Sequence, residues 1–293
     1  MTVVHVAVCG YLSLDRITLP TGAVHGGVPG GVIYTAVGAR YGGAEVGLLA
    51  CAGADFPEEA LASLAEAGVH VGHVERAAVP ARRARLVYDR GEGRRTLSYA
   101  DPQWSELTAK LAPPPIPSSW SPRVVVLSPM PVRSCRHYLE QAVTFGARVV
   151  MDTSEYYAST GRREILSLLK RVDLFCPSVE ESRLLVPGRD DDQALAELYC
   201  ETKGSVVQKR GRDGLKLMGH DHPSGLSVKS RAVEVVDTTG AGDTCVGALA
   251  AGLARGLTEI EMLDLGCEAA ALTVSTVGAP NLGQGSRFSD RTP

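Results

Sequence analysis

Residues Val233–Gly256 read VEVVDTTGAGDTCVGALAAGLARG and join three patterns that together indicate the fold. The valine-rich start predicts a strand, and Thr239–Gly242 predicts a tight turn after it. The apolar residues that follow recur at i, i+3, i+4 and i+7, as on one face of a helix: Val246, Leu249, Ala250 and Leu253. The glycine turn therefore precedes a helix N-terminus, where unpaired N–H groups and the positive end of the helix dipole attract an anion such as phosphate.

Asp243 stands inside this turn. An aspartate in the first turn of a helix commonly caps that helix, which is one interpretation. A carboxylate beside an anion site calls for a further reason, because on its own it repels phosphate. The second interpretation makes Asp243 a general base that takes the proton from an attacking hydroxyl, a contribution of about 10²–10⁴ in rate.

Several classes of protein find no support in the sequence. The 293 residues carry 30 Lys+Arg against 33 Asp+Glu, a formal net charge of −3, whereas a nucleic-acid binder shows a clustered basic excess. No P-loop motif G-x-x-x-x-G-K-[ST] is present, and G-x-G-x-x-G fails because the third glycine is Gly247. No apolar stretch of about 18 residues predicts a membrane helix. Seven scattered cysteines without C-x-x-C indicate reduced thiols in a cytoplasmic protein.

Short β-branched runs alternate with helical patterns along most of the chain. This alternation predicts an α/β fold with a mostly parallel central sheet flanked by helices, and apolar runs such as Val124–Leu127 suit strands buried on both faces. A chain of this length buries a large core without disulfides or a structural metal. We therefore expect a single domain over residues 1–293. The other expected strands are Val3–Cys9, Glu45–Cys51, Arg148–Asp152, Val172–Cys176 and Ser205–Lys209, and the expected helices are Glu58–Ala67, Ser134–Phe145, Arg162–Arg171 and Asp192–Thr202.

Two segments interrupt this alternation. Residues 11–30 are rich in glycine and proline, and residues 83–101 are typical of a hairpin around Gly91–Gly93. Both segments predict extended chain that pairs into a small sheet. The arginines of this region are typical of a solvated hairpin face, or they bind a phosphate already present on a substrate: Arg82, Arg83, Arg85, Arg94 and Arg95.

The motif D-T-T-G-A-G-D at Asp237–Asp243 resembles, residue for residue, the D-T-x-G-A-G-D signature of the ribokinase-like carbohydrate kinases, the phosphofructokinase-B superfamily. Gly10 and Asp15 resemble the start of that family's substrate site, and Gly30-Gly31 followed by a helical segment resembles its second signature. Ala269–Ala279 resembles its adenine-side helix and loop. The resemblance covers most of the chain and implies a ribokinase-like fold with a small β-sheet lid formed by about residues 11–30 and 83–101.

The resemblance also implies a function, which is ATP- and Mg²⁺-dependent phosphorylation of a hydroxyl on a sugar or sugar-like small molecule. It makes Asp243 the general base and the backbone amides of the glycine turn the anion hole: Gly240, Ala241 and Gly242. The implied substrate-binding residues are Asp15, Gly30, Gly31 and Thr35. The implied nucleotide-side residues are Lys209, Gly211, Gly214, Thr239, Thr273 and Gly278.

Some positions depart from the family pattern. Thr35 stands where the family has asparagine, which shortens or removes one contact to a substrate hydroxyl. The N-x-x-E motif appears as Ser178-Val179-Glu180-Glu181, with serine in place of asparagine. Glu181 keeps the position of the acid that holds Mg²⁺ through water, and Glu180 is the adjacent alternative. Asp237 resembles a position that binds a monovalent cation, K⁺, in potassium-activated members.

Three questions stay open at this level. The acceptor is a sugar or polyol, or a nucleoside, since a nucleoside-kinase branch shares the signature. A catalytically silent regulator that binds nucleotide or sugar is the alternative from a different class. An exposed edge of a short lid predicts pairing with a second subunit, hence a homodimer.

Overall fold

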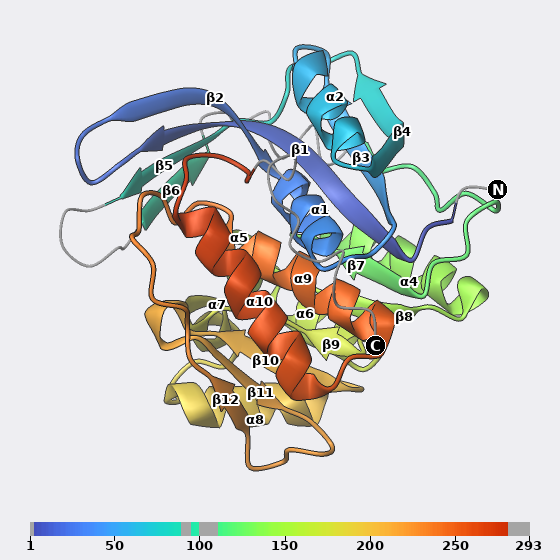
Figure 1. The fold of residues 1–293 in the computed structure, drawn as a ribbon. Helices are drawn as coiled ribbons and strands as arrows, with labels where there is room; N and C mark the ends of the chain where they lie inside the picture. The colour runs from blue at the N-terminus through green and yellow to red at the C-terminus, as the bar shows by residue number, and fades with distance from the viewer. Residues whose placement is uncertain (1–2, 89–94, 100–110, 281–293) are drawn as a thin grey trace.

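A computed structural model describes residues 3–88, 95–99 and 111–280, with only the backbone described for 95–99 (Figure 1). Its main sheet has the strand order β12-β11-β10-β9-β8-β7-β1-β3-β4. The parallel strands are β1 (Val6–Thr18), β3 (Val46–Gly53), β4 (Val69–Ala77), β7 (Val124–Leu127), β8 (Arg148–Met151), β9 (Leu174–Phe175) and β10 (Ser205–Lys209). Two antiparallel strands, β11 (Leu215–Met218) and β12 (Leu226–Val228), extend one edge.

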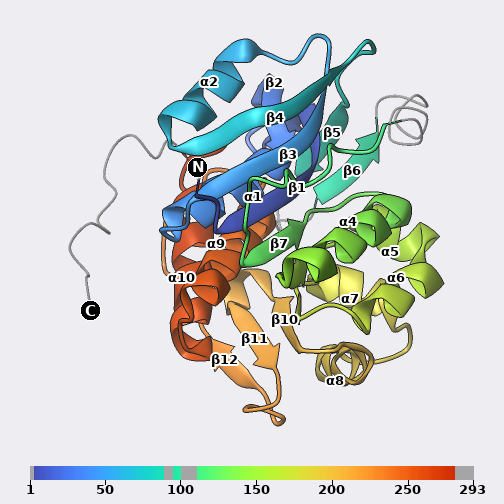
Figure 2. The same cartoon turned by 90° about the vertical axis from the view of Figure 1, so that its right-hand side faces the viewer.

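Helices cover both faces of this sheet, as Figure 2 shows in side view. One face carries α1 (Val32–Tyr41), α2 (Glu58–Glu66), α9 (Ala241–Arg255) and α10 (Glu259–Val274). The other carries α4 (Val132–Phe145), α5 (Glu155–Thr160), α6 (Arg162–Leu169), α7 (Val179–Leu185) and α8 (Asp191–Glu201). A short 3₁₀ turn, η1, spans Gly211–Asp213. The predicted α/β architecture is confirmed.

Strand β7 shows why the sheet needs helices on both sides. Val124 and Val126 belong to the core with α1 and α9, whereas Val125 and Leu127 belong to the core with α4 and α6. Successive side chains of a strand point to opposite faces, so a strand that is apolar at every position is buried on both. All four side chains are fully buried.

A second, smaller sheet grows out of β1, which continues past the body instead of ending near Cys9 as expected. Its outer half, residues 12–18, pairs antiparallel with β2 (Val24–Gly31) and parallel with β5 (Ala84–Tyr88). β5 in turn pairs with β6 (Arg95–Tyr99). We call β2, residues 12–18, β5 and β6 the outer sheet. Of the predicted segment 83–101, residues 89–94 and 100–101 lie outside the described part of the chain.

The expected strand at Val233–Asp237 is wrong. These residues form an irregular segment in which Val233, Val235 and Val236 are exposed. The Val236 and Asp237 N–H groups donate to the carbonyl of Val274, at the end of α10, at 2.7 and 3.2 Å. The segment thus pairs with a helix end instead of a strand, which β-branched composition does not reveal.

The sequence also predicts that no helix spans a membrane and that the cysteines are reduced thiols. Within the described residues, no helix has both the length and the apolar character that crossing a membrane requires. All seven cysteines are free thiols, and all except Cys200 are buried. Burial raises the pKa of the Cys135 thiol to about 12, so this group stays protonated at neutral pH.

Candidate active site

The glycine turn leads into α9 as the sequence predicts. Gly240 is the N-cap with a φ of 75°, a left-handed conformation that favours glycine, and its carbonyl accepts the Thr244 N–H at 2.8 Å. Helix geometry provides no carbonyl partner four residues back for the first-turn N–H groups. The Ala241 N–H faces only the Thr238 carbonyl, at a long 3.4 Å. This partly exposed turn can therefore direct amides toward an anion at the positive end of α9.

Tyr34, on α1, packs directly on this turn. A Cβ at Gly240 would lie 2.2 Å from Tyr34 Cδ1, so only glycine fits beneath the ring. The Tyr34 side chain is buried, and its hydroxyl has no hydrogen-bond partner among the described residues. Burial, followed by the charges of Asp237, Asp15 and Asp243, raises the pKa of the phenol well above its usual range. The predicted substrate-side and base carboxylates thus act on one neutral ring.

The predicted substrate residues meet where β1 pairs with β2. Asp15 is 7% exposed, and its Oδ1 accepts the Ala84 N–H of β5 at 3.3 Å. A Cβ on Gly30 would lie 2.2 Å from Asp15 Oδ2. Gly31 is the N-cap of α1 with a φ of 67°, and a Cβ there would lie 2.6 Å from the Tyr11 carbonyl oxygen. Only glycine at position 30 lets β2 approach the Asp15 carboxylate this closely, and glycine at position 31 lets the start of α1 approach the backbone of β1.

Thr35 lies in the contact between α1 and α9. Its side chain is fully buried, and its hydroxyl oxygen accepts a hydrogen bond from Ser128 Oγ at 3.3 Å. A Cβ on Gly247 of α9 would lie 2.0 Å from the Thr35 carbonyl oxygen. The structure therefore places Thr35 against α9, beside the residue that follows β7.

Lys209 ends β10, and its ammonium forms an ion pair with Asp152, which follows β8. The distance from Nζ to Oδ1 is 2.7 Å, and the two side chains are 12% and 3% exposed. Burial lowers the pKa of Lys209, but the charges of Asp152, Glu181 and Asp243 outweigh it and raise the pKa above its usual range. A Cβ on Gly242 would lie 3.5 Å from Nζ. The carboxyl ends of parallel strands thus assemble charged groups beside the α9 turn, where ligands of α/β sheets bind.

Glu181 and Ser178 form a capping box at the start of α7. The Glu181 N–H donates to Ser178 Oγ at 3.1 Å, and the Ser178 N–H donates to Glu181 Oε2 at 2.7 Å. The family's asparagine is replaced here by a residue that also caps a helix. Glu181 is 4% exposed and acts electrostatically on Lys209.

The carboxylates of this region fit a magnesium ion held mainly by nucleotide. Mg²⁺ in such sites keeps several waters and uses one or two carboxylates plus phosphate oxygens. Asp152 forms an ion pair with Lys209, and the charge of Glu181 acts on the same ammonium. Within the described part of the chain, no group of three acidic, histidine or cysteine side chains could hold a metal alone. The assignment of Glu181 to Mg²⁺ stays a prediction.

The predicted nucleotide-side glycines lie at turns around the sheet edge. Gly211 is the first residue of η1 and Gly214 directly follows its last, with φ values of 56° and 88°. A Cβ on Gly214 would lie 2.0 Å from the Val228 carbonyl oxygen. Glycine at this position therefore lets the end of β12 pack directly against the turn. Gly278 has a φ of 81° in the loop after α10, near Val28 of the outer sheet.

Asp237, Thr239 and Thr273 are all buried. Asp237 Oδ1 accepts the N–H and the hydroxyl of Thr239 at 2.9 and 2.7 Å, whereas Oδ2 has no hydrogen-bond partner among the described residues. Thr273 Oγ1 donates to the Ala269 carbonyl within α10 at 3.1 Å. The Tyr88 hydroxyl of β5 lies 2.8 Å from Thr239 Oγ1, which joins the outer sheet to the glycine turn.

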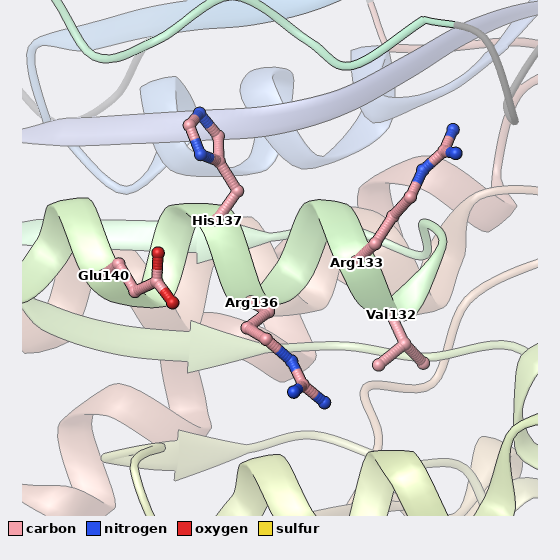
Figure 3. Close-up of a pocket in the computed structure, with 5 residues that line it drawn as sticks. All are labelled: Val132, Arg133, Arg136, His137 and Glu140. Atoms are coloured by element: carbon pink, nitrogen blue, oxygen red, sulfur yellow. The ribbon is translucent and has the colours of Figure 1, made fainter.

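A separate surface hollow of about 450 Å³ lies along α4. Its lining residues are Val132, Arg133, Arg136, His137 and Glu140. Figure 3 shows that Arg133 and His137 point to one side of the helix while Arg136 points to the other. The side chains do not converge on a common point, and none of them is a predicted site residue.

Comparison with known proteins identifies the family of this chain. The model of the pfkB family carbohydrate kinases matches residues 22–283. The chain belongs to this family. This pfkB kinase is 28% identical over 270 residues to a cytidine kinase from Thermococcus kodakarensis, an alignment that covers 90% of this chain and 93% of that protein. The predicted family and phosphotransferase class are therefore confirmed.

Solved structures confirm the fold of this pfkB kinase. A nucleoside kinase from Methanocaldococcus jannaschii, an archaeal member of the ribokinase family, superimposes with a TM-score of 0.74 at 17% identity, over 94% of this chain and 93% of that one. A structure from Escherichia coli in complex with ATP and Mg²⁺ gives a TM-score of 0.72 at 21% identity, over 94% of each chain.

Sequence reasoning missed three residues of this region: Tyr88, Ser128 and Asp152. Ser128 and Asp152 carried a usable signal, because each directly follows an observed strand of a parallel sheet. From the sequence Tyr34 is a candidate only for stacking on a nucleoside base, because its closeness to Gly240 depends on how α1 crosses α9.

Proposed function

We propose that this pfkB kinase transfers the terminal phosphoryl group of Mg·ATP to a hydroxyl of a small sugar, polyol or nucleoside, with Asp243 as general base. One observation carries this proposal, which is that the N-terminal turn of α9, which includes Asp243, packs on the buried Tyr34 ring, while the charges of Asp15 and Asp243 both raise the pKa of that phenol. An acceptor held by Asp15 would then present its hydroxyl to Asp243 beside an anion site.

In this proposal the chain mainly positions groups and neutralises charge, as phosphoryl transfer requires. Asp15, kept close to β2 by Gly30, accepts hydrogen bonds from acceptor hydroxyls. Asp243 takes the proton of the attacking hydroxyl while the bond from phosphorus to the leaving ADP oxygen breaks. The first-turn amides of α9 donate to the phosphoryl oxygens. Bound Mg²⁺, beside Asp152 and Glu181, would neutralise phosphate charge.

The outer sheet is proposed to act as a lid. The 2.8 Å contact between Tyr88 and Thr239 brings β5 onto the glycine turn, and the Ala84 N–H of the same strand contacts Asp15. A sheet that touches both halves of the site would exclude water and so prevent hydrolysis of ATP. We also propose the buried Asp237 Oδ2 as a ligand for K⁺, since a buried carboxylate oxygen needs a positive or hydrogen-bonding partner.

A nucleoside acceptor is the second candidate, supported by the full-length alignment with a cytidine kinase. The rings near the site give it little support as base-stacking platforms. Arg82 covers Tyr11, with its guanidinium carbon 5.1 Å from the ring centroid, and Tyr34 lies against Gly240. Base recognition would then depend on hydrogen bonds or on groups outside the described residues.

The test is ADP release from Mg·ATP with a panel of pentoses, hexoses, inositols and nucleosides. We expect turnover with one acceptor class, and we expect Asp243→Asn to lower kcat by about 10²–10⁴ with little change in the KM for ATP, because general-base assistance acts in the transition state. Asp221→Asn, a change at an 80% exposed aspartate in the β11–β12 connection, is the matched control and should keep full activity.

Two outcomes would contradict parts of this proposal. Turnover that survives Asp243→Asn would remove the base from the mechanism. Binding of nucleotide and sugar without ADP release from any acceptor would favour the catalytically silent regulator instead.

A further inference from the structure

The ion pair between Lys209 and Asp152 is unusual for its burial. The chain forms a second Lys–Asp pair of the same length, Lys203 with Asp173 at 2.7 Å, but those side chains are 56% and 19% exposed against 12% and 3% here. Taking two charges out of water costs several kcal/mol per ion, so a buried pair is weak evidence for a stabilising role. The pair calls for an explanation at the site.

The position of the ammonium supplies one. Lys209 Nζ lies 3.5 Å from where a Cβ on Gly242 would be, and Cδ lies 3.6 Å from it, so the side chain borders the first turn of α9. The same turn carries Asp243 and directs its amides toward an anion. Lysine binds phosphate as a compact point charge, and the dipole of α9 adds to its positive field.

Asp152 holds the Lys209 ammonium beside this turn through their 2.7 Å ion pair. Asp243 in the same turn adds a negative charge beside the proposed anion site. An arriving polyphosphate therefore needs a fixed positive group on the protein side.

We propose that the Lys209 ammonium binds the terminal phosphoryl group of the nucleotide, and that Asp152 is the positioning residue that holds it there. The inference rests on the proposed kinase function and deepens it. During transfer the bond from phosphorus to the ADP oxygen breaks, the bond to the acceptor oxygen forms, and the acceptor proton goes to Asp243. The Lys209 ammonium takes no part in proton transfer. Its positive charge stabilises the negative charge of the transferring phosphoryl group.

The decisive comparison is between ADP and a non-hydrolysable ATP analogue, each with Mg²⁺, measured by calorimetry on the wild-type chain and on Lys209→Met. We expect the Kd of the analogue to rise at least tenfold, about 1.4 kcal/mol, and the Kd of ADP to change less than twofold. In the ADP-release assay kcat should fall about 100-fold. Lys203→Met removes the exposed lysine of the matched pair and should change neither Kd nor kcat.

A purely structural role predicts a different pattern. If the pair only ties β8 to β10, Lys209→Met should lower the melting temperature and weaken both nucleotides equally, or neither, and that result would overturn the inference. Lys209→Gln keeps the length and polarity of the side chain and gives the same comparison if the methionine variant does not fold.

The role of Asp152 has its own readout. Asp152→Asn keeps the ammonium but loosens its position, so we expect kcat to fall at least tenfold while the Kd of the ATP analogue stays within about threefold. Unchanged kcat would remove Asp152 as a positioning residue. A wild-type chain that releases no ADP would contradict the proposed function, whereas the nucleotide comparison would still decide the role of Lys209.

Discussion

Gly30 shows how one missing methyl group shapes the substrate side of the site. It lies in β2 opposite Ser13, and a Cβ there would reach within 2.2 Å of Asp15 Oδ2. Gly30→Ala must therefore displace the Asp15 carboxylate or push β2 away. Because Asp15 is proposed to hold the acceptor, we expect the KM for the acceptor to rise at least tenfold while the KM for ATP stays within about twofold, measured by steady-state ADP release.

The same strand provides the matched control. Gly26 lies in β2, has no positive φ, and has no atom within 4 Å of a built Cβ. Gly26→Ala should leave both KM values unchanged. An equal rise of the acceptor KM in both variants would mean that general stiffening of β2, instead of the Asp15 contact, sets acceptor binding.

The crossing of α1 and α9 is the element-scale feature that brings the two halves of the site together. Gly38 of α1 and Gly247 of α9 each lie against the backbone of the other helix, with built Cβ atoms 2.0 Å from the carbonyl oxygens of Thr244 and Thr35. Gly247→Ala would force the helices apart, and overpacking of this kind costs about 1–3 kcal/mol or more. We expect a melting temperature several degrees lower and reduced kcat, measured by calorimetry and ADP release.

Gly252, five residues further along α9, is the control for this prediction. The three atoms nearest to a Cβ there all belong to Met262, at 3.1–3.4 Å, so a small shift of that residue would make room. Alanine also has a higher helix propensity than glycine by about 1 kcal/mol. Gly252→Ala should therefore be neutral or slightly stabilising, and a loss of stability equal to that of Gly247→Ala would refute the close-crossing explanation.

At the scale of the whole molecule, the outer sheet has an open edge. Among the described strands β2 pairs only with β1, most of its residues are at least partly exposed, and Val24 is 49% exposed. An open edge presents unpaired N–H and C=O groups that can pair with a second copy. We expect a C₂ dimer, with a mass by light scattering of twice the 30.9 kDa of one chain.

Val24→Lys should shift this dimer toward monomer, because charge on an edge strand opposes pairing. Val143→Lys, a change at a 70% exposed valine on α4 outside the outer sheet, is the control and should leave the mass unchanged. A monomeric wild-type chain would reject pairing through this edge.

Local patterns were sufficient for the elements and for the chemistry of the glycine turn. The apolar spacing of Val246 and Leu249 predicts α9, because helix periodicity depends only on neighbours along the chain. Valines fail as a guide at Val233–Asp237, because the same residues can hydrogen-bond to the end of α10 as readily as to a strand.

The sequence by itself determined the α/β class, the family and the turn that carries Asp243. Each depends on local patterns of neighbouring residues, such as apolar periodicity and the motif at Asp237–Asp243. Tertiary structure alone decided that Tyr34 covers Gly240, that Tyr88 reaches Thr239, and that Asp152 meets Lys209. The residues of each pair are far apart along the chain. The contacts arise from sheet order and helix crossing, which depend on how the whole core packs and on no single segment.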